Sequence, residues 1–171
     1  KIVQTSVKLK IPIVSFYVFS SENWFRPKKE IDFLFKLIKN YFTKELNNTI
    51  KKGIKINIIG EINRLPKDIR KSLKSSIEKT KDNKKIHVNL AINYGSKKEI
   101  TNAAKKNKKK KNIKNLEKRL YTQWIPDQDI LIRTGGHKRL SNFMLWQLAY
   151  TELFFLNKLW PDFNSNDLIK I

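Results

Sequence analysis

Hydrophobic positions along the chain fall into two kinds of segment, short continuous apolar runs and longer stretches with apolar residues at helical spacing. Three runs have the length and the β-branched and aromatic composition of buried strands: residues 11–20, 54–60 and 86–92. A fourth, shorter run lies at residues 130–132. We predict that these four runs are strands of a largely parallel sheet.

Helices are predicted between the strands. Pro27 precedes a segment with apolar residues at helical spacing, and Pro66 opens another that runs to about residue 81. Residues 143–153 form the most helix-like apolar run. Strands that alternate with helices are typical of α/β folds. We predict one α/β domain over residues 1–171, with three α/β/α layers and a central, largely parallel sheet.

Composition narrows the classes of function. The chain has 37 basic and 15 acidic residues and a net charge of +22, which favours polyanionic partners such as nucleic acid, anionic membranes or phosphorylated substrates. It has no cysteine, which excludes disulfides and cysteine-ligated metals. No apolar run approaches the length of a membrane span. The lysine-rich segment 97–119, with four consecutive lysines at 108–111, is expected to be solvated and mobile.

Arginine carries more information here than lysine, because lysine is spread throughout the chain whereas arginine occurs at six positions: Arg26, Arg64, Arg70, Arg119, Arg133 and Arg139. Two of them bracket the Gly-Gly turn in the stretch RTGGHKRLSNF at 133–143. Guanidinium forks bind phosphate oxygens, and Ser141 or free N–H groups at the start of a following helix could complete an anion cradle. The stretch predicts a phosphate or diphosphate pocket, with an ordinary surface turn as the alternative.

A second candidate lies after the first predicted strand. The polar loop SSENWFRP occupies residues 20–27, and ligands of open α/β sheets bind at the carboxyl ends of strands. For Trp24, packing in the hydrophobic core is the alternative to a role in ligand binding. His87 lies within a predicted strand, and we interpret it as structural.

Taken together, several segments resemble the cis-prenyltransferases, the family of undecaprenyl and dehydrodolichyl diphosphate synthases. The matching segments are FSSENWFRP at 19–27, IIGEINRLP at 58–66, NLAINYG at 89–95, the block from 125 to 155, and LWPDF at 159–163. This resemblance implies a Mg²⁺-dependent enzyme that condenses isopentenyl diphosphate with an allylic diphosphate such as farnesyl diphosphate. It also implies a hydrophobic tunnel for the growing cis-polyprenyl chain and a homodimer.

The resemblance also implies roles for individual residues. The isopentenyl diphosphate positions are Arg133, Arg139, Leu140 and Ser141. The substrate-binding loop comprises Ser20, Ser21, Glu22, Trp24 and Arg26. Asn23 falls on a position often assigned as proton acceptor, yet an amide is a poor base, so we expect it to orient substrate. Glu152 falls on the Mg²⁺-ligating glutamate, although by pattern alone it is a lone acid in an apolar helix.

Two departures from the family pattern bear on catalysis. Family members carry an Asp-Gly-Asn-Gly-Arg-Trp type loop with an essential aspartate, and residues 1–171 contain no such motif. We therefore expect either a piece of a longer protein or a protein without catalytic power. An acidic residue usually follows the glycine pair, where this chain has His137, a candidate to help hold hydrated Mg²⁺.

Three hypotheses follow: a cis-prenyltransferase, a non-catalytic subunit of a heteromeric cis-prenyltransferase, and a basic nucleic-acid-binding module. The first is favoured because both arginine-containing motifs are present. The third would need aromatic residues among the basic runs, and the lysine block has none. We expect a cytoplasmic protein or one peripheral to a membrane, at the endoplasmic reticulum if the source is eukaryotic, where basic residues would favour anionic lipid.

Overall fold

The computed structural model describes residues 1–107 and 112–171. They form two compact units. The N-terminal unit comprises residues 6–94, and the C-terminal unit comprises residues 1–5 and 95–171. The lysine block at 108–111, which was predicted to be mobile, lies outside the described residues.

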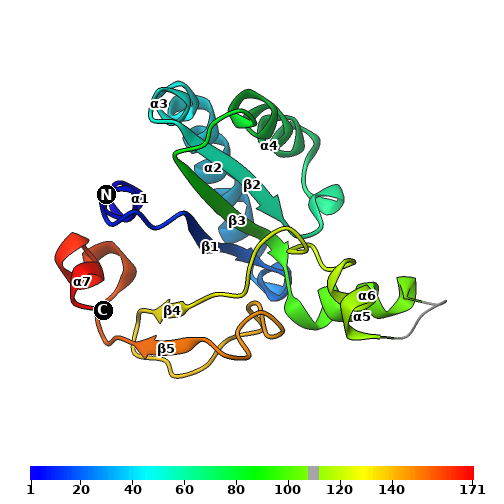
Figure 1. The fold of residues 1–171 in the computed structure, drawn as a ribbon. Coiled ribbons are helices and arrows are strands. Elements are labelled where there is room, and N and C mark those ends of the chain that lie inside the picture. Colours follow the sequence, from blue (N-terminus) through cyan, green and yellow to red (C-terminus); the bar gives the residue numbers. More distant parts are fainter. Residues whose placement is uncertain (108–111) are drawn as a thin grey trace. The chain divides into compact units, whose positions relative to one another are not determined.

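A three-stranded parallel sheet forms the centre of the N-terminal unit (Figure 1). Its strands are β1 (Ile13–Ser20), β2 (Ile54–Ile59) and β3 (Ile86–Tyr94), in the order β1-β3-β2. Parallel strands are usually covered by helices, and β3 in the centre is buried along most of its length. The three predicted strands are confirmed, with ends shifted by at most two residues.

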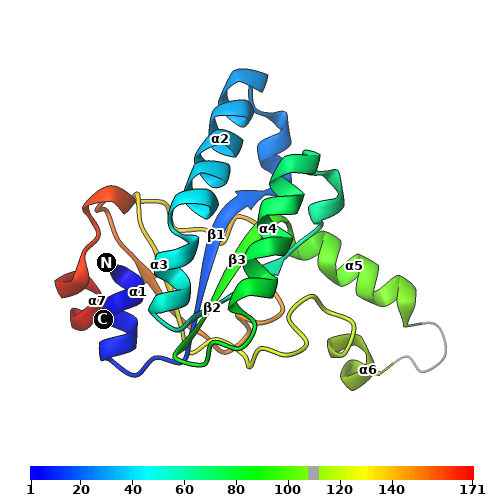
Figure 2. The same cartoon turned by 90° about the horizontal axis from the view of Figure 1, so that it is seen from above.

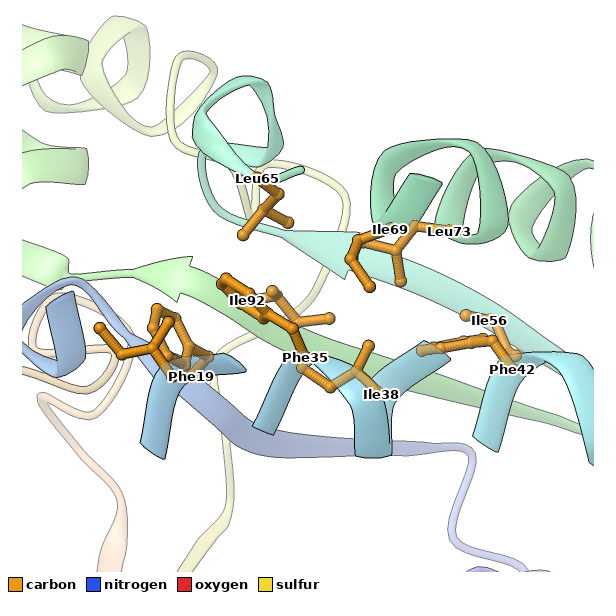
Figure 3. Close-up of a cluster of buried hydrophobic side chains, with 10 residues drawn as sticks. Phe19, Phe35, Ile38, Phe42, Ile56, Leu65, Ile69, Leu73 and Ile92 are labelled. Atoms are coloured by element: carbon orange, nitrogen blue, oxygen red, sulfur yellow. The ribbon is translucent and has the colours of Figure 1, made fainter. Parts of the chain in front are cut away.

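Helices α2 (Lys28–Lys44), α3 (Leu46–Lys51) and α4 (Lys67–Thr80) cover one face of this sheet (Figure 2). The apolar stripes of α2 and α4 and the sheet enclose one cluster of buried side chains (Figure 3): Phe19, Ile31, Phe35, Ile38, Phe42, Ile56, Leu65, Ile69, Leu73 and Ile92. Burying each large apolar side chain stabilises a fold by about 1.5–3 kcal/mol, so this cluster is the main stabilising element of the unit. Both predicted helices after prolines are confirmed.

The carboxyl edge of this sheet carries the loops with polar motifs. The 3₁₀ helix η1 (Ser21–Phe25) follows β1, and Gly60 and the 3₁₀ helix η2 (Ile62–Arg64) follow β2. Asn93 lies near the end of β3, with a φ of 50°. Because the strands are parallel, their ends bring these three segments to the same edge.

The C-terminal unit contains a second parallel pair, β4 (Ile130–Arg133) and β5 (Glu152–Phe155), seen side by side in Figure 1. Its helices are α5 (Ser96–Lys106), α6 (Ile113–Glu117), the 3₁₀ helix η3 (Trp160–Asp162) and α7 (Ser165–Lys170). The short helix α1 (Ile2–Lys8) begins in this unit, where the Thr5 hydroxyl donates to the Ser165 hydroxyl at 2.7 Å. The strand predicted at 130–132 is confirmed, but it pairs with β5 in a separate two-stranded sheet instead of joining β1, β2 and β3.

The helix predicted over residues 143–153 is wrong. Residues 141–150 form turns and bends, and Glu152 begins β5. Within the predicted range Met144 has a φ of 45°, which a right-handed helix does not allow, and Ser141 and Asn142 just before it have φ values of 50° and 62°. Ser96 stabilises this course, because its N–H donates to the Asn142 carbonyl and its hydroxyl accepts from the Leu145 N–H. Tertiary hydrogen bonds therefore override the helical spacing of the apolar residues.

No helix within the described ranges is both long and apolar enough to cross a membrane. The α/β class with parallel strands is confirmed.

Candidate functional site

The loop after β1 is organised by its own side chains. The Ser20 N–H donates to the Asn23 amide oxygen at 2.8 Å, which closes the single turn of η1. The Ser21 hydroxyl donates to the Glu22 carboxylate at 3.1 Å. Arg26 pairs with Glu30 at 3.6 Å on the exposed side of α2. The amide oxygen of Asn23 is thus used to shape the loop.

Trp24 holds the loop against the core. Its ring meets Phe19 edge-on at a centroid distance of 5.4 Å and Phe35 at 5.5 Å. Its Nε1–H donates to the Asn93 side-chain oxygen at 2.8 Å, and the Asn93 amide nitrogen donates to the Glu61 carbonyl at 2.7 Å. Asn93 therefore links the ends of β1, β2 and β3 through side-chain contacts.

Asn93 is a residue that the sequence analysis did not single out. It is buried, and it lies in the left-handed region that asparagine tolerates better than most residues. The available signal was its place after an apolar strand, where a polar residue in a buried position requires a partner.

An exposed apolar surface on α2 was also not predicted. Phe33, Leu37 and Tyr41 follow one another at intervals of four residues and are between 49% and 60% exposed. They lie on a different side of the helix from the core residues, because the buried positions of α2 are Ile31, Phe35, Ile38 and Phe42. Phe25, in the loop before α2, is 91% exposed. The N-terminal unit therefore presents unburied aromatic and aliphatic groups on and next to α2.

Tyr17 lies within β1, shortly before the loop that begins at Ser20. Burial, reinforced by the negative charge of Glu22, raises the pKa of the Tyr17 hydroxyl to about 12. The hydroxyl donates to the Tyr94 carbonyl at 3.2 Å. Tyr17 therefore stays protonated near neutral pH and acts as a hydrogen-bond donor.

In the C-terminal unit, β4 delivers Arg133 to the start of the Gly-Gly loop. One guanidinium nitrogen, Nη1, donates to the Ser141 hydroxyl oxygen at 2.8 Å and also to the Arg139 carbonyl. Arg133 thus closes the loop 133–141 and brings three of the four predicted isopentenyl diphosphate positions together. The fourth, Leu140, lies between them, and its carbonyl accepts from the Phe143 N–H.

The two arginines of this loop carry uncompensated charge. Within residues 1–107 and 112–171 neither guanidinium forms an ion pair with a carboxylate. Partial burial, and then the positive charge of Arg139, lower the pKa of Arg133 from its ordinary value. Arginine nevertheless remains protonated in proteins, so the loop keeps two adjacent positive charges. Such a pair is stabilised by an anion bound between or beside the guanidinium groups.

The glycine pair contributes conformation rather than free N–H groups. Gly135 and Gly136 have φ values of 88° and 75°, which other residues adopt at a cost. Their N–H groups donate to the carbonyls of Lys158 and Leu156, each at 2.9 Å. The expectation of free N–H groups at the start of a following helix is also wrong, since no helix begins there. Anion binding by this loop would therefore rest on side chains.

The two candidate metal ligands, Glu152 and His137, lie on different segments of the chain. Glu152 is exposed at the first position of β5 and pairs with Ile130, whereas Arg133 pairs with Phe155 at the other end. Three residues along a strand correspond to roughly 10 Å, so the register does not place the Glu152 backbone beside Arg133. His137 is exposed within the Gly-Gly loop. In the described part of the chain no three His, Cys, Asp or Glu side chains cluster as a metal site.

An exposed carboxylate is nevertheless compatible with Mg²⁺. This ion usually keeps several waters and takes one or two protein carboxylates together with substrate phosphates. Glu152 fits such a role as a hard oxygen ligand, whereas the described residues form no complete protein cage.

Comparison with known proteins shows which family and which relatives this chain resembles. A family model described as "Putative undecaprenyl diphosphate synthase" matches residues 1–171. An isoprenyl transferase of Rickettsia bellii is 47% identical over 167 residues, which cover 95% of this chain and 74% of the relative. An isoprenyl transferase of Oceanobacillus iheyensis is 43% identical over 176 residues, covering 97% of this chain and 70% of the relative.

Two solved structures share the fold. A probable undecaprenyl diphosphate synthase from Campylobacter jejuni matches with a TM-score of 0.92 and 36% identity, over 99% of this chain and 82% of that one. Lavandulyl diphosphate synthase from Lavandula x intermedia, in complex with dimethylallyl diphosphate, matches with a TM-score of 0.93 and 30% identity, over 99% and 78%. The predicted undecaprenyl diphosphate synthase-like fold is confirmed, and the chain belongs to the undecaprenyl diphosphate synthase family of prenyltransferases.

Proposed function

We propose that this protein is a cis-prenyltransferase that condenses isopentenyl diphosphate with an allylic diphosphate such as farnesyl diphosphate. The product would be a long-chain cis-polyprenyl diphosphate, a precursor of a glycosyl carrier lipid. The observation that carries the proposal is the closed loop in which Arg133 binds Ser141 beside the charge of Arg139. Family membership supplies the reaction class.

The loop 133–141 would bind the diphosphate of isopentenyl diphosphate. Arg139 is exposed and free of ion pairs among the described residues, so its fork is available for bidentate binding of phosphate oxygens. One guanidinium nitrogen of Arg133 already donates to Ser141. We propose that Arg133 both positions the Ser141 hydroxyl and contributes positive charge. Both charges would lower the free energy of a bound diphosphate.

In each condensation a carbon–carbon bond forms between the terminal alkene carbon of isopentenyl diphosphate and the allylic carbon. The allylic carbon–oxygen bond breaks, inorganic diphosphate leaves with the electron pair, and the alkene substrate loses a proton. We assign that proton to a diphosphate oxygen or a water, because Asn23 is an amide with its oxygen already bound to Ser20. Asn23 would keep the loop in shape.

The residues of loop 20–26 are proposed to bind the allylic substrate. The polar side chains proposed for this role are those of Ser20, Ser21, Glu22 and Arg26. Trp24 fixes the loop backbone through Asn93. The exposed side chains of α2 lie on the helix that follows this loop, and we propose that they form part of the hydrophobic path of the prenyl chain: Phe33, Leu37 and Tyr41.

Mg²⁺ is proposed as the cofactor, with Glu152 as its protein ligand and His137 as a weaker candidate. When bound, the ion would neutralise developing negative charge on the departing diphosphate. A Glu152→Gln variant should then require a higher Mg²⁺ concentration for half-maximal activity while keeping its fold. An unchanged Mg²⁺ dependence would remove Glu152 from this role.

We also propose a homodimer that works in the cytoplasm or peripherally at the cytoplasmic face of a membrane. The dimer and the location rest on family resemblance and basic charge alone.

The test of the proposed function is an elongation assay on the full-length gene product. It combines farnesyl diphosphate, labelled isopentenyl diphosphate and Mg²⁺, with EDTA as the metal control. We expect Mg²⁺-dependent elongation that falls by at least roughly tenfold in Arg139→Ala and remains in Arg119→Ala, an exposed arginine outside the loop. A folded protein that binds diphosphate without elongating it would instead be a non-catalytic subunit.

A further inference from the structure

Helix α4 carries a row of positive charges on the side turned away from the core. The row consists of Lys67, Arg70, Lys71 and Lys74. Apart from the consecutive pair Arg70 and Lys71, each cation lies three or four positions from two others, a spacing that makes side chains neighbours on a helix. The buried residues of α4 occupy other positions: Ile69, Leu73, Ser76 and Thr80. Together with Ser75, the four cations line an open hollow of about 540 Å³.

These charges lack carboxylate partners, although α4 contains two acidic residues. Asp68 pairs with Lys39 of α2 at 2.8 Å, and Glu78 pairs with Lys81. Both acids are therefore neutralised by lysines outside the row. In the described ranges no ion pair reaches any of the four cations. Four like charges within about two helical turns repel one another unless an anion is bound.

Arg70 distinguishes this row from the solvated lysines elsewhere. Its Nε atom is buried and, within the described structure, finds no hydrogen-bond acceptor. A buried donor without an acceptor is uncommon and unfavourable in native proteins. If the Arg70 side chain turns outward, its guanidinium can donate to a phosphate group in the hollow, which would satisfy this donor while the lysines supply further charge.

We propose that this face of α4 binds the phosphate groups of an anionic phospholipid membrane. A short row of cations on an exposed helix face has the chemistry that binds anionic lipid headgroups. The α4 sequence contains no aromatic residue, so it offers no stacking platform for nucleic-acid bases. The choice of membrane rests on the proposed function, because a polyprenyl product must pass from the enzyme into a bilayer.

The experiment is sedimentation of the full-length protein with vesicles, without substrate. One vesicle type is phosphatidylcholine, and the other adds phosphatidylglycerol. The test variant, called the α4 variant, replaces three cations of the row with Gln: Arg70, Lys71 and Lys74.

The matched control, called the α2 variant, removes the same number of charges from another helix. It replaces three exposed lysines of α2 with Gln: Lys29, Lys36 and Lys44. We expect the α4 variant to lose roughly tenfold to a hundredfold in affinity for anionic vesicles, and the α2 variant to lose much less.

Equal losses in the two variants would overturn the proposal, because net charge rather than α4 would then control binding. Inorganic phosphate should release the protein no better than chloride at equal ionic strength, and specific release by phosphate would point to a soluble phosphate ligand instead. Tight RNA binding that depends on α4, without vesicle binding, would also refute the proposal.

Elongation with water-soluble substrates in detergent should be unchanged in the α4 variant. If the wild-type protein showed no elongation, the proposed function would be refuted, and the result of the vesicle experiment would still stand.

Discussion

Gly60 shows how strictly a single residue is fixed by its surroundings. Its φ is 121°, and a Cβ atom added there would lie 2.3 Å from the Ile92 carbonyl oxygen. The backbone of β3 cannot move away without disturbing the centre of the sheet. Gly135 has a φ of 88°, but an added Cβ would meet no atom within 4 Å.

We predict that Gly60→Ala lowers the free energy of unfolding by about 3 kcal/mol or more, because strain and overlap add. Gly135→Ala should cost only about 1–2 kcal/mol, from the unfavourable φ alone. Chemical denaturation of both variants measures the difference. Equal destabilisation would show that overlap with β3 does not matter at Gly60.

The indole N–H of Trp24 provides a second test at the residue scale. Trp24→Phe keeps an aromatic ring against Phe19 and Phe35 but leaves the Asn93 oxygen without its donor. We expect a loss of about 1–2 kcal/mol in stability.

If the Trp24–Asn93 hydrogen bond positions the substrate loop, KM for the allylic diphosphate should also rise in Trp24→Phe, with little change in KM for isopentenyl diphosphate. A pure loss of stability with unchanged KM values would make this hydrogen bond structural only.

At the scale of elements, patterns within one segment were predictable and contacts between segments were not. The strands of the N-terminal unit were predicted because each is a continuous β-branched run. Helices α2 and α4 were predicted because each follows a proline and has apolar residues at helical spacing. The link between Arg133 and Ser141 could be anticipated, because a glycine turn separates two polar residues only eight positions apart.

The features that were predicted wrongly or not at all depend on the three-dimensional packing of the chain. The helix expected over 143–153 is replaced by turns that Ser96 stabilises from 49 residues away. The role of Asn93 was not predicted because its hydrogen-bond partner Trp24 is 69 residues away in the sequence. The exposed side of α2 was missed because the helical spacing of its apolar residues predicts a helix without showing which of them face the core.

Helix α7 yields a prediction about pH. Asp167 accepts from the Asn164 N–H and from Lys158, and the hydrogen bond from Lys158 is the main cause that lowers the Asp167 pKa below 3.8. A lowered folded pKa gives stability that is present above the unfolded pKa and is lost as pH falls through the folded value.

Asp167→Asn should therefore be less stable than wild type near neutral pH, and this difference should shrink as pH falls below about 4. Thermal denaturation at several pH values measures it. A difference that stays constant down to the most acid pH would contradict an ionic origin.

At the scale of the whole molecule, each compact unit carries one part of the proposed chemistry. The N-terminal unit carries the loop 20–26 and the apolar side of α2, and the C-terminal unit carries the arginine loop. Binding of isopentenyl diphosphate can therefore be measured apart from condensation, since the proposal assigns it to the arginine loop.

The most direct test is calorimetric titration of the full-length protein with isopentenyl diphosphate, compared with Arg139→Gln and with Arg119→Gln as matched control. Hydrogen bonds to a charged group contribute about 1.5–3 kcal/mol, so Arg139→Gln should weaken binding by roughly tenfold to a hundredfold. Arg119→Gln should bind as wild type does. Wild-type affinity in Arg139→Gln, or equal losses in both variants, would contradict the assignment of the arginine loop to the diphosphate.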